Sequence, residues 1–287
     1  MGTSISYEEE TVFQFIRSIY DGVIIRGDRS IIRPQEIDIL LPDLKLGIEY
    51  DGLRYHSELE GKDRHYHLNK TETAEQNGYS LLHIFSDEWL NFITRLIWES
   101  MLRAKVGMIT EKIYARECIL KSIEYGEAKV FFDTNHLAGS IRAKVYLGLF
   151  KDNELVSALC YGPSRFLKDE IEIYRFASKM NIVVIGAMGK LLSVVPKDNL
   201  VSFADRRFSS TFASSYNKFF NTREAIAPSW YGFDVKTHDL HHRWYFTKEK
   251  MKILFENYDE TKTVSENMFA NGYDRIWDCG NWKYSNS

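Results

Sequence analysis

The sequence predicts an α/β protein of the α+β type, in which mixed sheets are flanked by helices. Short apolar or alternating stretches, typical of strands, are interspersed along the chain with amphipathic stretches of helical length. Turn signals separate neighbouring strand candidates, as at Pro42-Asp43-Leu44 and Lys151-Asp152-Asn153. A chain of 287 residues is long enough for two domains. We predict domains over 1–110 and 111–237, with the boundary between 105 and 115, and a tail over 238–287.

The first domain begins with a predicted amphipathic helix over 7–20, whose acidic first turn suits the helix dipole. A helix over 62–77 ends before Gly78, because glycine favours the left-handed conformation that follows a helix. The pattern from Asp87 to about Lys121 is helical throughout. Strands are predicted at 36–41, 45–51 and 79–85, the first two joined as a hairpin.

The second half predicts helices over 128–136 and 186–195 between strands. Asn271-Gly272 is a turn signal that precedes the last strand. The strands are expected at 143–150, 154–162, 170–177, 200–204 and 273–277.

The composition argues against some classes of protein. A net charge of −3 at pH 7 offers no general basic surface, which disfavours a protein that coats DNA passively. A nuclease is not disfavoured, since it needs only local charge. No segment approaches about 18 uncharged apolar residues, and the first residues lack the pattern of a signal peptide. The scattered Cys118, Cys160 and Cys279 are typical of reduced thiols in the cytoplasm.

Carboxylates gather on the predicted hairpin. Side chains alternate along a strand, so Glu36 and Asp38 share one face, as do Glu49 and Asp51. A turn at 42–44 brings Asp38 opposite residues 48–49. Such a cluster is repulsive unless a proton or a divalent cation neutralises it, and oxygen ligands suit magnesium or manganese. The alternative is a set of solvated carboxylates on an exposed face.

Two further features follow the hairpin. Gly52 permits a sharp departure from the strand, which would let His56 return towards the carboxylates as a general base. In the helix over 62–77, Asp63, His67 and Lys70 are spaced to share a face that presents a cation to a phosphate. A solvated helix face is the alternative.

The run EIDILLPDLKLGIEYDGLRYHSE, followed by KDRHYHLNKTETAEQNGYSLLHIFSDEW, resembles the small PD-(D/E)xK nucleases related to very-short-patch-repair endonucleases. It is especially similar to the nuclease module of phage homing endonucleases, over about residues 5–100. The resemblance implies a restriction-endonuclease-like mixed sheet, double-stranded DNA as the substrate, and the cytoplasm of an infected bacterial cell as the location.

The resemblance also implies roles for single residues. Asp38 is the first metal-binding Asp of the motif and Glu49 is the second acidic position, while Asp51 stands where the motif has Lys. His56 or Lys70 would then take the role of that Lys, and Asp51 would join the metal shell or orient His56. An acidic residue of the first helix, Glu9 or Glu10, would complete the site. The implied catalytic set is Asp38, Glu49, Asp51, His56 and Lys70, with Mg²⁺ or Mn²⁺ held by Asp38, Glu49, Asp51 and Glu10.

The order of elements over 125–235 resembles the GNAT acyltransferase fold. Gly186-Ala187-Met188-Gly189 stands where that fold has a pyrophosphate-binding turn, and Tyr216 resembles its helical Tyr. The usual Arg/Gln-rich approach to the turn is absent, so an ordinary tight turn remains the alternative. Phage homing endonucleases with this nuclease module have a similar second half, with a run like Ala204-Asp205-Arg206-Arg207 and a tail like NGYDRIWDCGN.

Contacts to DNA phosphates or bases are expected from basic side chains in both halves. In the tail, His238, His241 and His242 lie close to Arg243 and Trp244, and we interpret them as a DNA-contacting segment or a zinc site. The predicted contacts are Arg54, Lys62, Arg64, Arg142, Lys144, Arg165, Arg206, Arg207 and Lys218.

Three functions are compatible with these patterns. The first is a metal-dependent DNA endonuclease with site preference; a single site per chain indicates nicking or action as a homodimer. The second is a GNAT-like group transferase acting on DNA or protein. The third is a catalytically inactive DNA-binding protein, since the usual motif Lys is missing.

Overall fold

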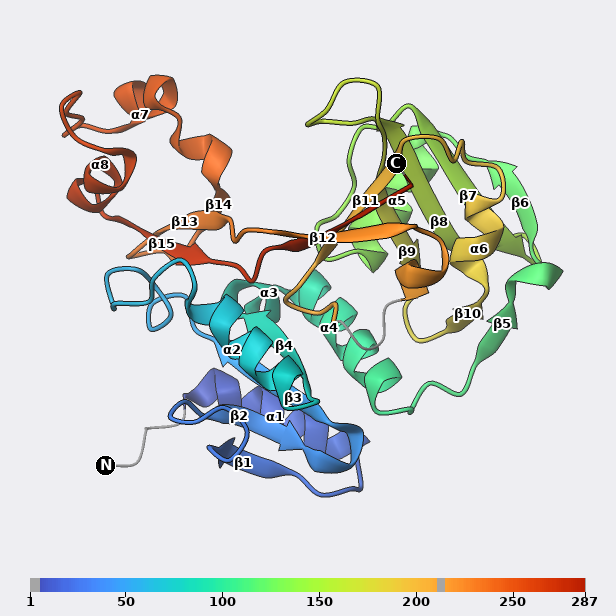
Figure 1. Cartoon of the computed structure of the whole chain (residues 1–287), viewed down its shortest axis with the longest axis horizontal. Coiled ribbons are helices and arrows are strands. Elements are labelled where there is room, and N and C mark those ends of the chain that lie inside the picture. Colours follow the sequence, from blue (N-terminus) through green and yellow to red (C-terminus); the bar gives the residue numbers. More distant parts are fainter. Residues whose placement is uncertain (1–5, 211–214, 287) are drawn as a thin grey trace.

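The computed structural model of the chain describes residues 6–210 and 215–286. The predicted α+β fold is confirmed, because mixed sheets are flanked by helices. Figure 1 shows the N-terminal elements in blue and cyan, a larger sheet in green and yellow, and a small orange and red module beside them. In the part of the chain that the structure describes, no helix is both long and apolar enough to cross a membrane.

The N-terminal unit is a four-stranded sheet covered on both faces. Its strand order is β1 (Ile25–Asp28), β2 (Ile37–Leu41), β3 (Leu46–Asp51) and β4 (Ser80–Phe85); β3 and β4 are parallel, and the other pairs are antiparallel. Three helices pack on one face around Ile48 and Ile84, namely α1 (Tyr7–Ile19), α3 (Ser86–Leu90) and α4 (Phe92–Lys105). The other face carries α2 (Tyr66–Gln76), which packs through Ala74 on Leu81. All six residues of β3 are therefore buried.

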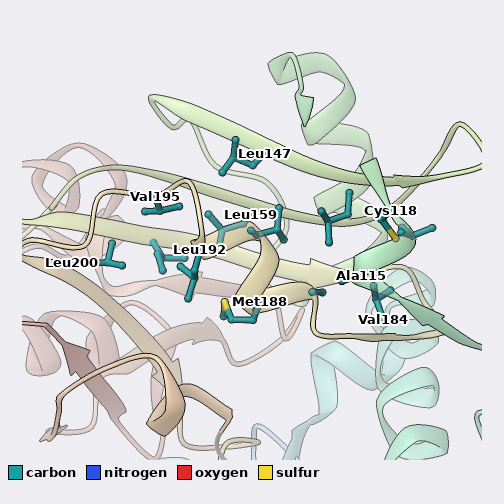
Figure 2. Close-up of a cluster of buried hydrophobic side chains, with 14 of the residues drawn as sticks. Ala115, Cys118, Leu147, Leu159, Val184, Met188, Leu192, Val195 and Leu200 are labelled. Atoms are coloured by element: carbon teal, nitrogen blue, oxygen red, sulfur yellow. The ribbon is translucent and has the colours of Figure 1, made fainter. Parts of the chain in front are cut away.

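A seven-stranded sheet forms the second unit. Its order is β12 (Thr222–Ile226), β16 (Asn281–Ser285), β11 (Leu200–Asp205), β9 (Ile171–Ser178), β8 (Glu154–Pro163), β7 (Val145–Lys151) and β6 (Ile119–Ser122). Only β9 and β11 pair in parallel among these described strands. One face is covered by α5 (Tyr125–Asn135) and the other by α6 (Ala187–Leu192). Figure 2 shows Met188 and Leu192 of α6 in one buried cluster with Leu147, Leu159 and Leu200 of the sheet.

Smaller elements complete the chain. A parallel pair, β5 (Lys112–Tyr114) with β10 (Val183–Ile185), packs on the core of the second unit. Short turns of 3-10 helix cover Pro42–Leu44, Ala115–Glu117 and Ser215–Lys218. The third unit is an antiparallel sheet in the order β14 (Leu240–His242), β13 (Trp230–Asp234) and β15 (Tyr273–Trp277). It is packed by a 3-10 turn (Arg243–Phe246), α7 (Lys248–Leu254) and α8 (Val264–Ala270).

Several predicted elements end elsewhere. The helix expected to run to Lys121 stops at Lys105, because Gly107 adopts a positive φ of 79° and its amide closes the last turn on Ala104. The helix predicted over 62–77 begins only at Tyr66, and that predicted over 186–195 has six residues. Elsewhere the predicted strands and helices lie within a few residues of the observed ones.

The tail does not begin a separate unit at residue 238. Strand β13 precedes that position and pairs with both β14 and β15, so the predicted boundary cuts through a sheet. The last strand, β16, leaves the small module and inserts between β12 and β11 of the seven-stranded sheet. Strand pairing is not local in sequence, so composition gave no indication of either connection.

Two buried arginines attach the N-terminal unit to the segment after β11. The guanidinium of Arg206 lies 3.0 Å from Glu72 and 3.6 Å from Glu75 on α2, above the ring of Trp282. Arg207 is paired with Glu88 at 3.0 Å and with Asp205 at 2.9 Å. Their relative exposures are 2% and 6%. The predicted DNA contacts of Arg206 and Arg207 are therefore wrong, since neither guanidinium is free to reach a phosphate.

Replacing Arg207 tests this attachment. Arg207→Met leaves the carboxylates of Glu88 and Asp205 without their buried cation, so the free energy of unfolding is expected to fall by about 3 kcal/mol. Arg29→Met is the matched control, because Arg29 pairs with Glu36 at the surface, and it should cost less than about 1 kcal/mol. Urea unfolding followed by tryptophan fluorescence gives both values. Equal losses would contradict an attachment role.

Candidate active site

The hairpin places Asp38 beside Glu49, as the sequence predicts. The pairing of β2 with β3 ends at Ile39 with Ile48, and Asp38 and Glu49 are the next residues along the two strands. The backbone N–H of Tyr50 donates to Asp38 Oδ2 at 2.8 Å. Burial raises the pKa of Asp38 to about 6, although the charge of Lys70 acts in the opposite direction. Asp38 is thus a buried carboxyl group that keeps its proton to a higher pH than a solvated Asp does.

Helix α2 supplies a lysine to this pair. Lys70 Nζ donates to Glu49 Oε2, and both side chains are buried. Burial and the charge of Asp38 raise the pKa of Glu49 well above its usual value. Burial alone would lower the pKa of Lys70, but the charges of Glu49 and Asp38 raise it. Glu49 Oε1 is buried and has no hydrogen-bond partner among the described residues.

Three histidines surround the fully buried Asp51. His56 Nδ1 lies 2.9 Å and His67 Nε2 lies 3.5 Å from Asp51 Oδ1, while His83 Nδ1 lies 2.8 Å from Oδ2. Burial would raise the pKa of Asp51, but His67, His83 and His56 hold it well below its usual value. The expected return of His56 towards the carboxylates is confirmed. The sequence separates these residues, and strand β3, the loop after it, α2 and β4 bring them together.

His83 is the inner support of this group. Burial lowers its pKa to about 4, so the ring is neutral at pH 7. A neutral ring that faces a carboxylate carries its proton on Nδ1, and Nε2 is left to accept from Thr71 Oγ1 at 2.9 Å. Thr71 also lies 3.4 Å from the buried Cys279 of the C-terminal segment. A line of contacts therefore runs from Asp51 through His83 of β4 and Thr71 of α2 to Cys279.

The loop between β3 and α2 is held by the small C-terminal module. Arg275 of β15 donates twice to Glu58, at 2.7 Å each, and Trp277 Nε1 donates to the same carboxylate at 3.2 Å. A backbone hydrogen bond adds to this contact, because the N–H of Glu58 donates to the C=O of Arg275 at 2.8 Å. In Figure 1 this loop, in light blue, lies directly below β13 and β15. His56 is carried by a loop whose position depends on residues more than two hundred positions later.

Basic and aromatic side chains surround the loop. Arg54 and Arg64 are exposed and Lys62 is half-buried. Lys62 Nζ lies 4.4 Å above the ring of Tyr66, and Arg64 lies 5.6 Å from the ring of Trp277. These three positions remain compatible with the predicted phosphate contacts.

Other predicted site residues are not brought to the carboxylates. The carboxylate of Glu10 accepts hydrogen bonds from Arg26 and Gln14 at 2.6 Å each, so its predicted place in the metal shell is not supported. Glu9 is the carboxylate of α1 whose charge acts on Asp38. Glu36 pairs instead with Arg29. Asp63 precedes α2 and bonds the N–H of His65, so it shares no helix face with His67 and Lys70.

The remaining basic candidates lie outside this region. Lys144 and Lys218 are exposed. Arg142 is also exposed and lies 3.7 Å over the ring of Tyr125. Arg165 is paired with the buried Glu172. The structure leaves Arg142, Lys144 and Lys218 accessible on the second unit.

The glycine turn of the second unit has a structural role here. Helix α6 behind it has six residues, and Lys190 donates to the carbonyls of Ala115 and Cys118. Gly189 packs against Phe219, since a Cβ there would lie 3.2 Å from that ring. Tyr216 stacks on Phe220 with ring centroids 5.8 Å apart. These contacts favour the ordinary tight turn over a phosphate site.

The three tail histidines do not converge. His241 stacks on Tyr245 at 4.3 Å, His242 faces Tyr231 at 5.5 Å, and His238 faces Phe233 at 6.4 Å. Within residues 6–210 and 215–286, the one group of three or more His, Cys, Asp or Glu residues whose ligand atoms lie within 4.8 Å of one another is Asp51, His56 and His67. The zinc interpretation of the tail is therefore wrong.

Sequence reasoning did not predict the residues that hold Asp51 and the His56 loop in place, which are His83, Thr71, Glu58 and Arg275. One signal was available, because His83 is the only polar residue between the ends of the apolar run LLHIF. A His inside a strand that is buried on both faces needs a polar partner. No sequence signal connects Glu58 with Arg275, which are 217 positions apart.

Comparison with known proteins adds nothing to this geometry. No family model and no curated protein matches the chain. The assignment of the site therefore depends on the contacts described above.

A charge swap tests the hold on the loop. Glu58→Arg and Arg275→Glu each oppose like charges at the contact, so amides of residues 52–65 are expected to exchange about tenfold faster, equivalent to about 1.4 kcal/mol of opening free energy. The double variant restores an ion pair with reversed polarity and should recover most of the protection. Hydrogen–deuterium exchange with peptide resolution measures all three. Unchanged exchange in both single variants would show that the loop is held by other contacts.

Proposed function

We propose that this chain is a metal-dependent endonuclease that hydrolyses phosphodiester bonds of double-stranded DNA. The observation that carries the proposal is the contact between Lys70 and Glu49, beside Asp38. In this proposal Asp38 and Glu49 are the two acidic positions of a PD-(D/E)xK site and Lys70 is its lysine, although Lys70 comes from α2 and not from the strand. The missing motif Lys is therefore a weak argument for an inactive protein.

The residues fit a hard divalent cation. Asp38 and Glu49 lie on adjacent strands, and the charge of Asp38 acts on Glu49. Glu49 Oε1 lacks a hydrogen-bond partner within the described chain. Magnesium and manganese favour such all-oxygen sites. A bound ion would lower the pKa of a coordinated water and stabilise negative charge on the phosphate.

The protein groups have separable roles in this proposal. Asp38 and Glu49 hold the cation, and their raised pKa values mean that a proton must leave before it binds. Lys70 keeps Glu49 oriented and supplies a buried positive charge beside the two carboxylates. Tyr50 fixes the carboxylate of Asp38 through its backbone N–H.

DNA binding is proposed from the surroundings of the loop. Arg54, Lys62 and Arg64 belong to the same segment between β3 and α2 as His56. The overall net charge of −3 means that DNA binding would depend on such local groups of basic residues. Arg142, Lys144 and Lys218 offer a second set of accessible cations. One site per chain cleaves one strand, so we propose nicking by a monomer or a double-strand break by a homodimer.

Cleavage of supercoiled plasmid tests the proposal. Wild-type protein is expected to produce nicked or linear DNA with Mg²⁺ and none with EDTA. Asp38→Asn and Glu49→Gln should each lose about 1,000-fold in rate, since each removes a ligand of the cation. Lys70→Met should lose about 100-fold.

Asp43→Asn is the matched control, because this carboxylate stands in the turn of the same hairpin and outside the site. It should cleave as the wild type does. Absence of cleavage on plasmid and phage DNA by folded wild-type protein, despite measurable binding, would overturn the nuclease and leave a DNA-binding role.

The raised pKa of Asp38 predicts a pH dependence. Its value of about 6 means that the carboxyl is largely protonated below pH 6, whereas a solvated Asp would already be ionised there. Cleavage at low Mg²⁺ is therefore expected to rise as the pH is raised through about 6. Higher Mg²⁺ should move the rise to lower pH, because the cation competes with the proton. Initial cleavage rates from pH 5 to 8 at two Mg²⁺ concentrations measure the shift of the pH profile. A pH profile that is the same at both Mg²⁺ concentrations would contradict competition between the proton and the cation.

A further inference from the structure

A second group of ligand atoms stands beside the carboxylate pair. Asp51 Oδ1, His56 Nδ1 and His67 Nε2 form a triangle with sides of 2.9, 3.1 and 3.5 Å. Asp51 and His67 are 0% and 1% exposed, while the side chain of His56 is 17% exposed. Each residue turns one electron-rich atom towards the same point.

Hydrogen bonds account for only part of this convergence. His56 Nδ1 lies 2.9 Å from Asp51 Oδ1 and 3.1 Å from His67 Nε2, so one proton on His56 Nδ1 can be directed at the carboxylate or at the other imidazole. The atom that this proton does not serve is buried and loses that hydrogen bond, which is costly. A cation at the centre of the triangle would satisfy all three atoms.

We propose that Asp51, His56 and His67 bind one first-row divalent transition-metal ion of the zinc type. Two imidazole nitrogens and one carboxylate oxygen suit such ions and not magnesium or calcium, which take oxygen ligands. Zinc–ligand bonds of about 2.0–2.1 Å at tetrahedral angles separate neighbouring ligand atoms by roughly 3.3–3.4 Å. The observed sides of 2.9, 3.1 and 3.5 Å lie around that separation.

The surrounding residues complete the geometry of a metal site. His83 Nδ1 holds the other oxygen of Asp51 at 2.8 Å, which fixes the orientation of the carboxylate. Three protein ligands leave the fourth position of a tetrahedral ion open. Of the three residues, His56 has the most exposed side chain, so solvent would reach a bound ion from its side.

This site is distinct from the proposed magnesium site. Asp51 follows Glu49 by two positions on β3, so their Cα atoms are about 7 Å apart along the strand. The inference changes the role of His56 from general base to metal ligand. It does not depend on the proposed nuclease activity, because metal binding is measured without DNA.

The test uses the full chain, stripped of metal with a chelator and titrated with Zn²⁺ or Co²⁺ in a calorimeter. We expect one ion per chain, and a visible absorption band of tetrahedral cobalt. His67→Ala and Asp51→Asn should weaken binding at least about 100-fold, and His83→Gln about 10-fold through the orientation of Asp51.

His56→Gln is the ligand variant expected to disturb folding least, because His56 is the most exposed of the three ligands. Circular dichroism shows whether each variant is folded. His241→Ala is the control, since this histidine is stacked in the tail, and it should bind zinc as the wild type does. No zinc binding by the wild type, or unchanged binding in all three ligand variants, would overturn the inference.

Plasmid cleavage by the zinc-free protein with Mg²⁺ separates the two proposals. Cleavage without any zinc binding would remove the zinc site and keep the nuclease. Zinc binding without cleavage would keep the zinc site and remove the nuclease.

Discussion

The structure depends on the burial of two carboxylates in the middle strand of the N-terminal sheet. Glu49 and Asp51 are both 0% exposed, and a charged carboxylate without partners is costly in such surroundings. Each partner comes from a different element: Lys70 from α2, His83 from β4 and His56 from the loop. The arrangement of these elements around β3 is the means by which the buried charge is balanced.

The second half of the chain supports the same region from outside. Arg206 and Arg207 join the segment after β11 to α2 and α3, and Arg275 holds the loop of His56. Cys279 approaches Thr71 behind His83. The C-terminal segment is thus part of the environment of the candidate site, although the sequence suggested an independent tail.

Sequence reasoning located most of the site because its signals are local. The alternation of polar and apolar residues in 36–51 placed Asp38 opposite residues 48–49, and in the structure Asp38 and Glu49 directly follow the pair of Ile39 with Ile48. The predicted roles of Glu10, Arg206 and Arg207 are not supported, because each side chain is held in an ion pair inside the protein. Glu10 pairs with Arg26, Arg206 with Glu72, and Arg207 with Glu88. Charge alone does not distinguish a cation that meets DNA from one that meets a carboxylate inside the protein.

The sequence by itself determined the α+β class, the hairpin with its carboxylates, and the return of His56 after Gly52, because strand periodicity and turn residues act over a few positions. Tertiary structure alone decided that Asp51 meets three histidines and that Lys70 meets Glu49. It also decided that β16 belongs to the seven-stranded sheet. Those contacts follow from which surfaces are buried together, and burial is a property of the whole chain.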